Sequence, residues 1–193
     1  MAFLNAEEIA RIGFSSCGKN VYISNKASFY GASNIQIGDN VRIDDFCVLS
    51  AGEGGIVIGN YVHIAVYSSL IGAGKITLKN FSNISSRVSI YSSSDDYSGE
   101  YMTNPLIPEK YTNITKEDVN IGEHVIIGSG SVVLPGVELK KGCAVGALSL
   151  VKNSFEEYAV IVGIPAKKIS DRVREVEKLQ MSFEKVNNMS NMP

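Results

Sequence analysis

The sequence predicts an all-β chain built as a parallel β-helix of six-residue repeats, with one long excursion loop and a C-terminal α-helix. Two observations predict this fold. Apolar residues recur at a strict spacing of six, and one long break, from Ser92 to Asp118, interrupts the repeats. A period of six matches neither the 3.6-residue turn of a helix nor a strand that alternates for its full length. It fits short strands separated by turns and stacked in a column.

The first segment, residues 1–16, is predicted to be a short helix and cap. Asn5 precedes Glu8 by three residues, and at this spacing each side chain can bond the backbone N–H of the other at the start of a helix. We therefore expect the helix to begin directly after Asn5.

The repeats define a β-helix domain over residues 17–170, with the excursion loop at 92–118. They are clearest from Asn120 onward, where the apolar positions are Ile121, Ile127, Val133, Leu139, Val145 and Val151. The residue four places after each of the first five is small or β-branched. Each short strand should therefore point one large side chain into the column, with one small side chain following it at the turn.

The last segment, residues 171–193, is predicted to be an amphipathic helix and tail. Val173, Val176, Leu179 and Phe183 recur at helical spacing, so one apolar stripe should lie on the β-helix or on a neighbouring subunit. We expect the final residues, NNMSNMP, to be frayed.

Composition favours a soluble, cytoplasmic protein that neither binds nucleic acid nor inserts into a membrane. The 18 basic and 20 acidic residues are interspersed and give a net charge of -2, so no basic face stands out. The N-terminus lacks the order of a signal peptide, and no apolar run approaches the roughly 20 residues that span a bilayer. Cys17, Cys47 and Cys143 have no metal-ligand spacing and are expected to be small buried residues.

The stretch VNIGEHVIIGSGSVVLPGVELKKGCAVGALSLVKNSFEEYAVIVGIPAKKI resembles the terminal coils of hexapeptide-repeat acyltransferases. These left-handed β-helix enzymes include maltose, galactoside and xenobiotic acetyltransferases and the N-acetyltransferases of nucleotide-linked amino sugars. The similarity extends over Gly18 to Ser170, and GSGSVVLPGV and VGIPAKKI are its most specific motifs. This chain departs from the family at Ile164, where most relatives have asparagine.

The resemblance implies a left-handed β-helix, a homotrimer with active sites in grooves between subunits, and acetyl-CoA along the late coils, with no metal. Backbone groups would face the pantetheine arm at Gly128, Ser129, Gly130, Ala147 and Leu148. N–H groups near Gly128 could also stabilise the thioester oxyanion. Lys167 and Lys168, after Pro165, would face the CoA phosphates, although a solvated surface or plain turn geometry would also explain these residue types.

The family resemblance also exposes a missing histidine. Sugar O-acetyltransferases of this family carry a catalytic histidine just after an "IY" pair, and VSIYSSSDD places Asp95 at that position. Ala65 stands where those enzymes usually have an assisting asparagine. A sugar hydroxyl needs a base with a pKa near 7, whereas a neutral amine is a stronger nucleophile. The substitution therefore favours transfer to an amine.

Several side chains around Asp95 are candidates for substrate contact, with a solvated loop as the alternative. Asp95 and Asp96 are adjacent, so repulsion and burial could raise the pKa of one of them, which could hold a substrate ammonium and accept its proton. The predicted sugar-contacting hydroxyls are those of Tyr91, Ser92, Ser93 and Ser94. Tyr97 and Tyr101 could stack on a ring.

Both histidines should point outward in the six-residue frame, since each directly precedes an inward position. His63 is the candidate replacement base, provided that it lies across a groove from Asp95 of its own or a neighbouring chain. His124 is a candidate for substrate contact. Alternatively, each histidine is simply an exposed polar residue on a coil, without a functional role.

The resemblance and the missing histidine together lead us to expect an acetyl-CoA-dependent N-acetyltransferase. We expect its acceptor to be a nucleotide-linked amino sugar, such as dTDP-4-amino-4,6-dideoxyglucose, used in the synthesis of bacterial surface polysaccharide. One alternative is a sugar O-acetyltransferase with His63 or His124 as an unusual base. Another is a non-catalytic trimeric scaffold. A zinc hydrolase would need three histidine ligands, and the chain has two histidines.

Overall fold

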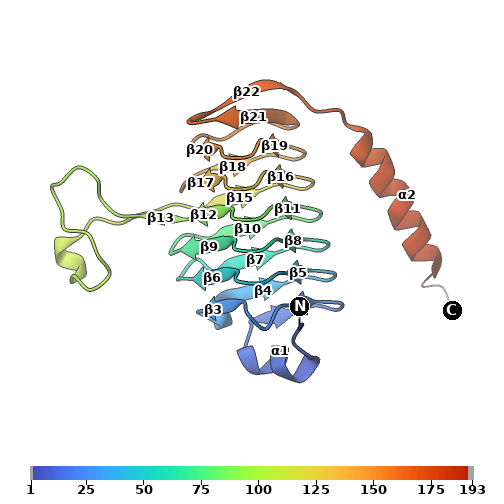
Figure 1. The fold of residues 1–193 in the computed structure, drawn as a ribbon, viewed down its shortest axis with the longest axis horizontal. Coiled ribbons are helices and arrows are strands. Elements are labelled where there is room, and N and C mark those ends of the chain that lie inside the picture. The colour runs from blue at the N-terminus through green and yellow to red at the C-terminus, as the bar shows by residue number, and fades with distance from the viewer. Residues whose placement is uncertain (1, 191–193) are drawn as a thin grey trace.

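The computed structural model describes residues 2–190, with side chains described as far as residue 186. The chain forms a solenoid of three parallel sheets, capped by helix α1 (Ala6–Ile12) at its N-terminal end and followed by helix α2 (Glu175–Ser190). Figure 1 shows the sheets stacked coil upon coil. The predicted parallel β-helix is confirmed. Helix α2 includes residues 187–190, where we expected frayed chain, and residues 191–193 lie outside the described residues.

The three sheets share the same coil order. Sheet 1 contains β1 (Ser16–Cys17), β4 (Ile35–Ile37), β7 (Ile56–Ile58), β10 (Ile76–Leu78), β15 (Val119–Ile121) and β18 (Glu138–Leu139). Sheet 2 contains β2 (Tyr22–Ile23), β5 (Arg42–Ile43), β8 (His63–Ile64), β11 (Asn83–Ile84), β16 (Ile126–Ile127), β19 (Ala144–Val145), β21 (Ala159–Gly163) and β22 (Ala166–Asp171). Sheet 3 contains β3 (Ser28–Tyr30), β6 (Val48–Ala51), β9 (Ser69–Gly72), β12 (Ser89–Tyr91), β17 (Val132–Val133) and β20 (Leu150–Val151).

The strands pair parallel within the three sheets except at the last pair, where β22 runs antiparallel to β21. The pairing register aligns the large apolar residues of successive coils, so that Ile64 lies between Ile43 and Ile84. All three side chains are completely buried. Burying one such side chain contributes about 2 kcal/mol, and no coil could bury its own row alone. The six-residue series predicted from the sequence is therefore the core itself.

The turns between sheets make three edges of a prism. Edge 1–2, between sheets 1 and 2, includes residues 59–62, 79–82 and 122–125. Edge 2–3 includes residues 44–47, 65–68, 85–88, 128–131 and 146–149. Edge 3–1 includes residues 52–55, 92–118 and 134–137. Each edge carries a different feature of the chain.

The N-terminal cap forms as the sequence predicts. The Glu8 N–H donates to Oδ1 of Asn5, and the Asn5 N–H donates to Oε2 of Glu8. Helix α1 then ends at Gly13, whose φ of 80° is in the left-handed region that glycine favours. One prediction is wrong here: Cys17 is exposed, because β1 is the first strand of its sheet and has a neighbour on one side only.

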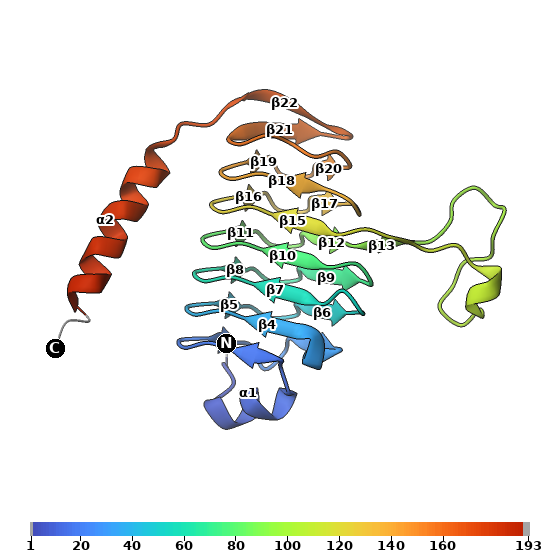
Figure 2. The ribbon, with the colours of Figure 1, turned by 180° about the vertical axis from the view of Figure 1, so that it is seen from behind.

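The excursion loop leaves edge 3–1 on a two-stranded stalk, in which β13 (Ser93–Ser94) pairs antiparallel with β14 (Thr115–Lys116). Beyond it lies the short 3-10 helix η2 (Glu109–Tyr111), while a second one, η1 (Ala32–Asn34), lies near the N-terminal end. Figures 1 and 2 show the loop projecting from the solenoid on the side opposite α2.

Helix α2 is attached at edge 1–2. Phe183 meets the rings of Tyr61 and Phe81 edge-on, at centroid distances of 5.2 and 6.2 Å. At the first turn of the helix, Tyr158 donates a hydrogen bond to Glu177 over 2.7 Å. The predicted apolar stripe therefore lies partly on the chain's own β-helix. Among the described residues, no helix is long and apolar enough to cross a membrane.

Candidate functional site

The residues predicted to bind CoA gather at the C-terminal half of edge 2–3. Gly128, Ser129 and Gly130 occupy the turn between β16 and β17, and Ala147 and Leu148 occupy the turn directly above, between β19 and β20. Leu148 is 70% exposed. A Cβ on Gly128 would come within 2.5 Å of the Ala147 nitrogen, so only glycine lets the two turns stack this closely.

This edge presents unpaired backbone donors. The neighbouring N–H groups of Gly128 and Gly130 donate to Val145 and Ser86. Within the described part of the chain, the N–H groups of Ser129 and Ala147 donate to no acceptor, and both residues are exposed. Exposed donors fixed on a rigid turn can bind a carbonyl oxygen or an oxyanion.

The other predicted CoA residues lie at the upper end of the same edge. Pro165 lies in the hairpin turn between β21 and β22, and the Gly163 N–H in that turn donates to Oγ of Ser149 over 3.1 Å. Lys167 pairs across the hairpin with Val162. Lys168 forms an ion pair with Asp171 at 2.6 Å, which leaves Lys167 as the lysine of this pair without a carboxylate partner among the described residues.

The predicted substrate residues meet at edge 3–1. A cavity of about 390 Å³ is lined by Tyr91, Ser93, Ser94, Asp95, Tyr97, Leu134 and Pro135. The aromatic rings, two hydroxyls and one carboxylate there suit a polar ring such as a sugar. Tyr97 is 92% exposed, so the cavity is open to solvent on the side of the loop.

The two adjacent aspartates differ in what they contact. Asp96 accepts hydrogen bonds from the hydroxyl and the N–H of Ser98 and from the N–H of Gly99, at 2.8–3.1 Å. These bonds, led by that from the Ser98 hydroxyl, lower the pKa of Asp96, so the raised pKa we expected is not found there. The Asp95 carboxylate has no partner within the described part of the chain and remains available to a ligand.

Ser92 is the one predicted hydroxyl of this group that does not reach the cavity. It is completely buried, and its Oγ donates to the carbonyl oxygen of Gly74 over 2.6 Å. This hydrogen bond holds the chain where the stalk leaves the solenoid. The prediction that Ser92 contacts the substrate is therefore wrong. Tyr101, 46% exposed, lies farther along the loop and does not line the cavity.

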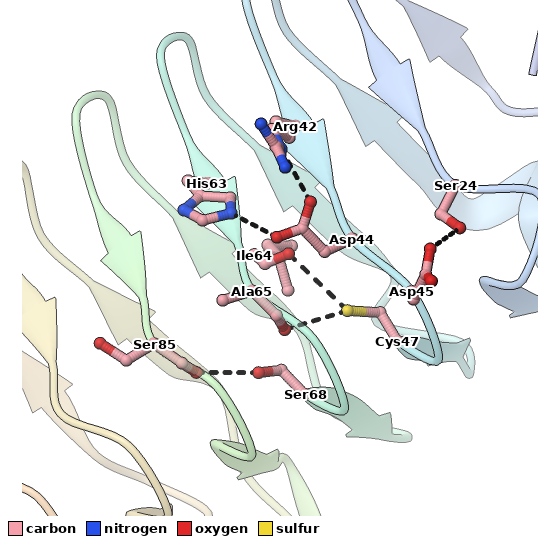
Figure 3. Close-up of polar contacts among 10 residues, drawn as sticks. All are labelled: Ser24, Arg42, Asp44, Asp45, Cys47, His63, Ile64, Ala65, Ser68 and Ser85. Atoms are coloured by element: carbon pink, nitrogen blue, oxygen red, sulfur yellow. Dashed lines mark hydrogen bonds and ion pairs between the residues drawn. The ribbon is translucent and has the colours of Figure 1, made fainter. Parts of the chain in front are cut away.

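His63 lies on the outer face of sheet 2 in a small charged group. Its Nε2 is 2.8 Å from Oδ2 of Asp44, and Nε of Arg42 donates to Oδ1 of the same carboxylate over 2.7 Å. Figure 3 shows this arrangement across β5, β8 and the turn that follows β5. Burial raises the pKa of Asp44, but hydrogen bonds from His63 and Arg42 outweigh it and keep this pKa below its usual value. The imidazole is thereby oriented, with 41% of its side chain exposed.

His124 proves to be a helix contact, which corrects its prediction as a substrate residue. Its ring stacks on Phe81 at 4.9 Å, and Nε2 is 2.6 Å from Oε1 of Gln180 in α2. The side chain points outward as expected, but α2 covers it and leaves the residue 9% exposed. It lies on edge 1–2, away from both candidate regions.

Within one chain the predicted catalytic pair does not meet. His63 lies on the strand that leads into edge 2–3, whereas Asp95 lies beyond edge 3–1. Strand β12 separates the two edges in one coil, by roughly 10–15 Å at the rise of a β-strand. One chain therefore holds two separate candidate regions: the edge with the predicted CoA residues, called the CoA edge below, and the acidic cavity.

Sequence reasoning missed residues of edge 2–3 that lie below Gly128. Ser85, Ser86 and Arg87 occupy the turn one coil earlier, and the Gly130 N–H donates to the Ser86 carbonyl over 3.0 Å. The signal was available, because these residues occupy the same place in the six-residue frame as Gly128, Ser129 and Gly130. No group of three or more histidine, cysteine or acidic side chains in the described chain could hold a metal ion.

Comparisons with known proteins agree with this fold. Residues 118–153 match the family described as "Bacterial transferase hexapeptide (six repeats)". An Escherichia coli dTDP-4-amino-4,6-dideoxy-D-glucose acyltransferase is 60% identical over 183 residues, which cover 95% of each chain. WbbJ of E. coli K12, named for O-acetyl transfer in lipopolysaccharide biosynthesis, is 32% identical over 76% of this chain and 73% of its own.

A solved structure also has a closely similar fold. AntD, an N-acyltransferase from Bacillus cereus, superimposes with a TM-score of 0.92 at 46% sequence identity, covering 96% of this chain and 98% of AntD. That structure contains dTDP and 3-hydroxybutyryl-CoA. A hexapeptide-repeat relative with this coverage thus accepts both an acyl-CoA and a thymidine nucleotide.

Proposed function

This chain belongs to the hexapeptide-repeat acyltransferases, and we propose that it transfers an acetyl group from acetyl-CoA to the amine of dTDP-4-amino-4,6-dideoxyglucose or a closely similar nucleotide-linked amino sugar. The observation that carries the acceptor is the carboxylate of Asp95, unpartnered within the described chain, at the mouth of a polar cavity. The E. coli relative, 60% identical over nearly the whole chain, acts on this sugar by its name.

The complete site is proposed to form between two chains of a homotrimer. The CoA edge and the acidic cavity lie on different edges of one prism, and the excursion loop projects away from its own solenoid (Figure 2). In a closed three-fold ring, each loop can reach edge 2–3 of the next chain. Asp95 of one chain would then face Gly128 and Ser129 of its neighbour.

The reaction needs few catalytic groups. The neutral amine nitrogen attacks the thioester carbon, and the oxyanion accepts hydrogen bonds from the N–H groups of Ser129 or Ala147. A new C–N bond forms in the tetrahedral intermediate, the C–S bond then breaks, and a proton released by the nitrogen passes to the sulfur, so that CoA leaves as the thiol. Asp95 is proposed to hold the substrate ammonium and accept its proton, with His63 as a second acceptor oriented by Asp44.

The remaining assignments follow the same proposal. Gly128, Gly130, Leu148, Pro165 and the two lysines of β22 would line the path of CoA, with Lys167 facing its phosphates. Tyr91, Ser93, Ser94 and Tyr97 would contact the sugar. A cytoplasmic enzyme of surface-polysaccharide synthesis fits this chemistry, since acetyl-CoA and nucleotide sugars are cytoplasmic metabolites, and WbbJ, a relative over three quarters of the chain, is named for lipopolysaccharide biosynthesis.

The deciding experiment measures thiol release from acetyl-CoA with a panel of amino and hydroxy sugars, free and nucleotide-linked. We expect turnover with the nucleotide-linked 4-amino sugar and none with its 4-hydroxy counterpart. Reactions without acceptor control for thioester hydrolysis. Turnover with hydroxy sugars alone would contradict the proposal and favour the O-acetyltransferase alternative, and the absence of CoA binding would favour a scaffold.

Two variants separate the proposed proton acceptors. Asp95→Asn should lower kcat/KM by about 10- to 100-fold, equivalent to roughly 1.4–2.7 kcal/mol. Asp96→Asn is the matched control, because its carboxylate is already bonded within the loop. His63→Ala should cost less than Asp95→Asn if the acceptor is an amine. A loss of several orders of magnitude for His63→Ala would instead identify it as an essential base.

A further inference from the structure

Edge 2–3 continues below the CoA residues as a column of four stacked side chains, which we call the edge column: Lys26, Phe46, Tyr67 and Arg87. Phe46 and Tyr67 are stacked, with centroids 4.9 Å apart and planes 15° from parallel. Nζ of Lys26 lies 5.2 Å from the Phe46 centroid, and Cζ of Arg87 lies 5.8 Å from that of Tyr67. A cation thus closes each end of an aromatic pair.

A similar stack of rings on edge 1–2 is covered by helix α2, whereas the edge column has no such cover within the described chain. On edge 1–2, Tyr61, Phe81 and His124 also stack from coil to coil. Helix α2 covers them, with Phe183 on the two aromatic rings and Gln180 on the histidine. On edge 2–3 nothing in the described chain covers the rings, and Phe46 and Tyr67 are 44% and 53% exposed. Large exposed aromatic rings flanked by cations are typical of a binding surface.

Charge within the edge column is not balanced at its upper end. Lys26 is paired with Asp45 at 3.2 Å. Arg87 is exposed and has no carboxylate partner within the described part of the chain, while its contact with Tyr67 holds the guanidinium along the edge. The column therefore presents one fixed, unneutralised positive charge directly below Gly130.

The turn that carries Arg87 holds further hydrogen-bond donors. The hydroxyls of Ser85 and Ser86 are half-buried in this turn and make no hydrogen bond within the described chain, and the Ser86 N–H is likewise unpaired. Figure 3 places Ser85 beside Ser68, whose Oγ donates to the Ser85 carbonyl over 2.9 Å and so fixes this turn. A guanidinium with hydroxyl and N–H donors on the same turn can bind the oxygens of a phosphate.

We propose that Arg87, with Ser85 and Ser86, binds the diphosphate of the acceptor nucleotide, and that the exposed edges of Tyr67 and Phe46 receive its nucleoside. This inference rests on the proposed function and assigns it a nucleotide subsite. The CoA phosphates are assigned elsewhere. Lys167 lies beyond Gly128 at the upper end of the edge, whereas Arg87 lies three coils below Gly163, roughly 14 Å away at the spacing of β-strands.

The test measures binding of dTDP and of CoA, each alone, to the full chain by calorimetry. For Arg87→Ala we expect the Kd of dTDP to rise about 10-fold or more, which corresponds to losing at least 1.4 kcal/mol. The Kd of CoA should stay within about two-fold, and the KM of the nucleotide sugar should rise far more than kcat falls. Arg87→Lys should recover part of the affinity, since it keeps the charge but not the fork.

Tyr67→Ala should also weaken dTDP binding, by about three-fold or more, through lost packing and a less restrained Arg87. Arg11→Ala is the matched control, because Arg11 is exposed on α1 at the N-terminal end and pairs with Glu7. Thermal unfolding of each variant shows whether it is folded. If Arg87→Ala does not fold, the dTDP affinity of Arg87→Lys provides the test.

Three results would overturn the inference. One is unchanged dTDP affinity in Arg87→Ala. Another is weakened CoA binding instead, which would assign Arg87 to the donor. The third is a changed molecular mass with dTDP affinity intact, which would make the edge column a contact between subunits. Wild-type protein that fails to bind dTDP would contradict the proposed function itself, whereas wild-type binding with an unaffected Arg87→Ala variant would contradict this inference alone.

Discussion

Ser82 and Ser68 occupy equivalent inward positions at the ends of neighbouring turns, and they differ in hydrogen bonding. Ser68 donates to the Ser85 carbonyl over 2.9 Å and accepts from the Val88 N–H over 3.3 Å. Ser82 Oγ is buried without any partner within the described chain. A buried hydroxyl left unbonded costs about 1–3 kcal/mol. In this core, therefore, the same side chain stabilises one turn and destabilises another.

We expect Ser82→Ala to raise the free energy of unfolding by about 1 kcal/mol, because it removes an unpaired polar atom from the core. Ser68→Ala should lower it by about 1–2 kcal/mol through loss of two hydrogen bonds. Thermal and denaturant unfolding of both variants would measure this difference of sign. Equal destabilisation by the two changes would show that the Ser82 hydroxyl is bonded in solution.

The Asp44 carboxylate gives a pH dependence of stability with a definite sign. Its pKa is lowered in the folded chain from an unfolded value of about 3.9. Its contribution is therefore fully present above about pH 5 and is lost as the pH falls through 4 toward the folded pKa. Asp44→Asn should reduce stability at pH 7 by about 2 kcal/mol, the range for hydrogen bonds to a charged group.

The loss caused by Asp44→Asn should shrink between pH 5 and pH 3, as protonation removes the same charge from the wild type. Thermal unfolding of both proteins at several pH values in this range would measure the difference in stability. Asp39→Asn serves as the control, because the Asp39 carboxylate makes no ion pair among the described residues. A wild-type minus Asp44→Asn difference that stays constant from pH 7 to pH 3 would disprove the role of this carboxylate.

At the scale of elements, helix α2 is joined to the β-helix by a few separate contacts. Its first turn is held by Tyr158 and by the ion pair of Lys141 with Glu177 at 3.2 Å. Farther along, Phe183 packs on edge 1–2 while Leu179 and Met181 remain 68% and 63% exposed. An element with so little buried area should open locally while the solenoid stays folded.

Phe183→Ala should therefore increase amide hydrogen exchange along α2 and leave exchange in sheet 2 unchanged. The expected loss is about 1–2 kcal/mol of local stability, since the ring is only partly buried. Met181→Ala, an exposed position on the same helix, should have little effect. If Phe183→Ala also destabilised the solenoid strands, α2 would have to be counted as part of the core.

The sequence predicted the repeating coils and the two terminal helices, but not the contacts that join distant segments of the chain. The apolar series around Ile121 and Ile127 follows from local spacing, because each coil packs on the next coil along the chain. Other contacts join segments that are far apart in the sequence and share no repeat, such as Ser93 with Lys116 in the stalk and His124 with Gln180 of α2. Nothing local distinguishes Asp95 from Asp96 either, since the bonds to Ser98 appear only once the loop is folded. The positions of coil residues along the column therefore follow from the sequence, whereas the contacts of loop residues do not.

At the scale of the whole molecule, the proposed division of the site between two edges can be tested by mixing defective chains. Asp95→Asn damages the cavity at edge 3–1, and Ala147→Trp places a large side chain on the exposed CoA edge. Ala147→Trp alone should be nearly inactive, and Asp95→Asn alone should keep about 1–10% of wild-type kcat/KM. In a random mixed trimer, about a quarter of the interfaces would join an intact loop to an intact edge, because each is present in half of the chains.

Co-refolding the two variants in equal amounts should therefore restore about a quarter of wild-type turnover if the site spans two subunits. Mixing the folded proteins without exchange of subunits is the control and should restore none. If co-refolded, subunit-exchanged material stayed inactive, each site would have to be complete within one chain.

The antiparallel return of β22 has a consequence for how the molecule behaves at high concentration. A stack of parallel coils presents an open strand at each end, on which a second solenoid could continue the ladder into a fibre. Here the final strand reverses direction and carries Lys167, Lys168 and Asp171, while α1 occupies the opposite end. Within the described chain, the reversed and charged strand at one end and the helix at the other should therefore disfavour end-to-end polymerisation of the stacked coils.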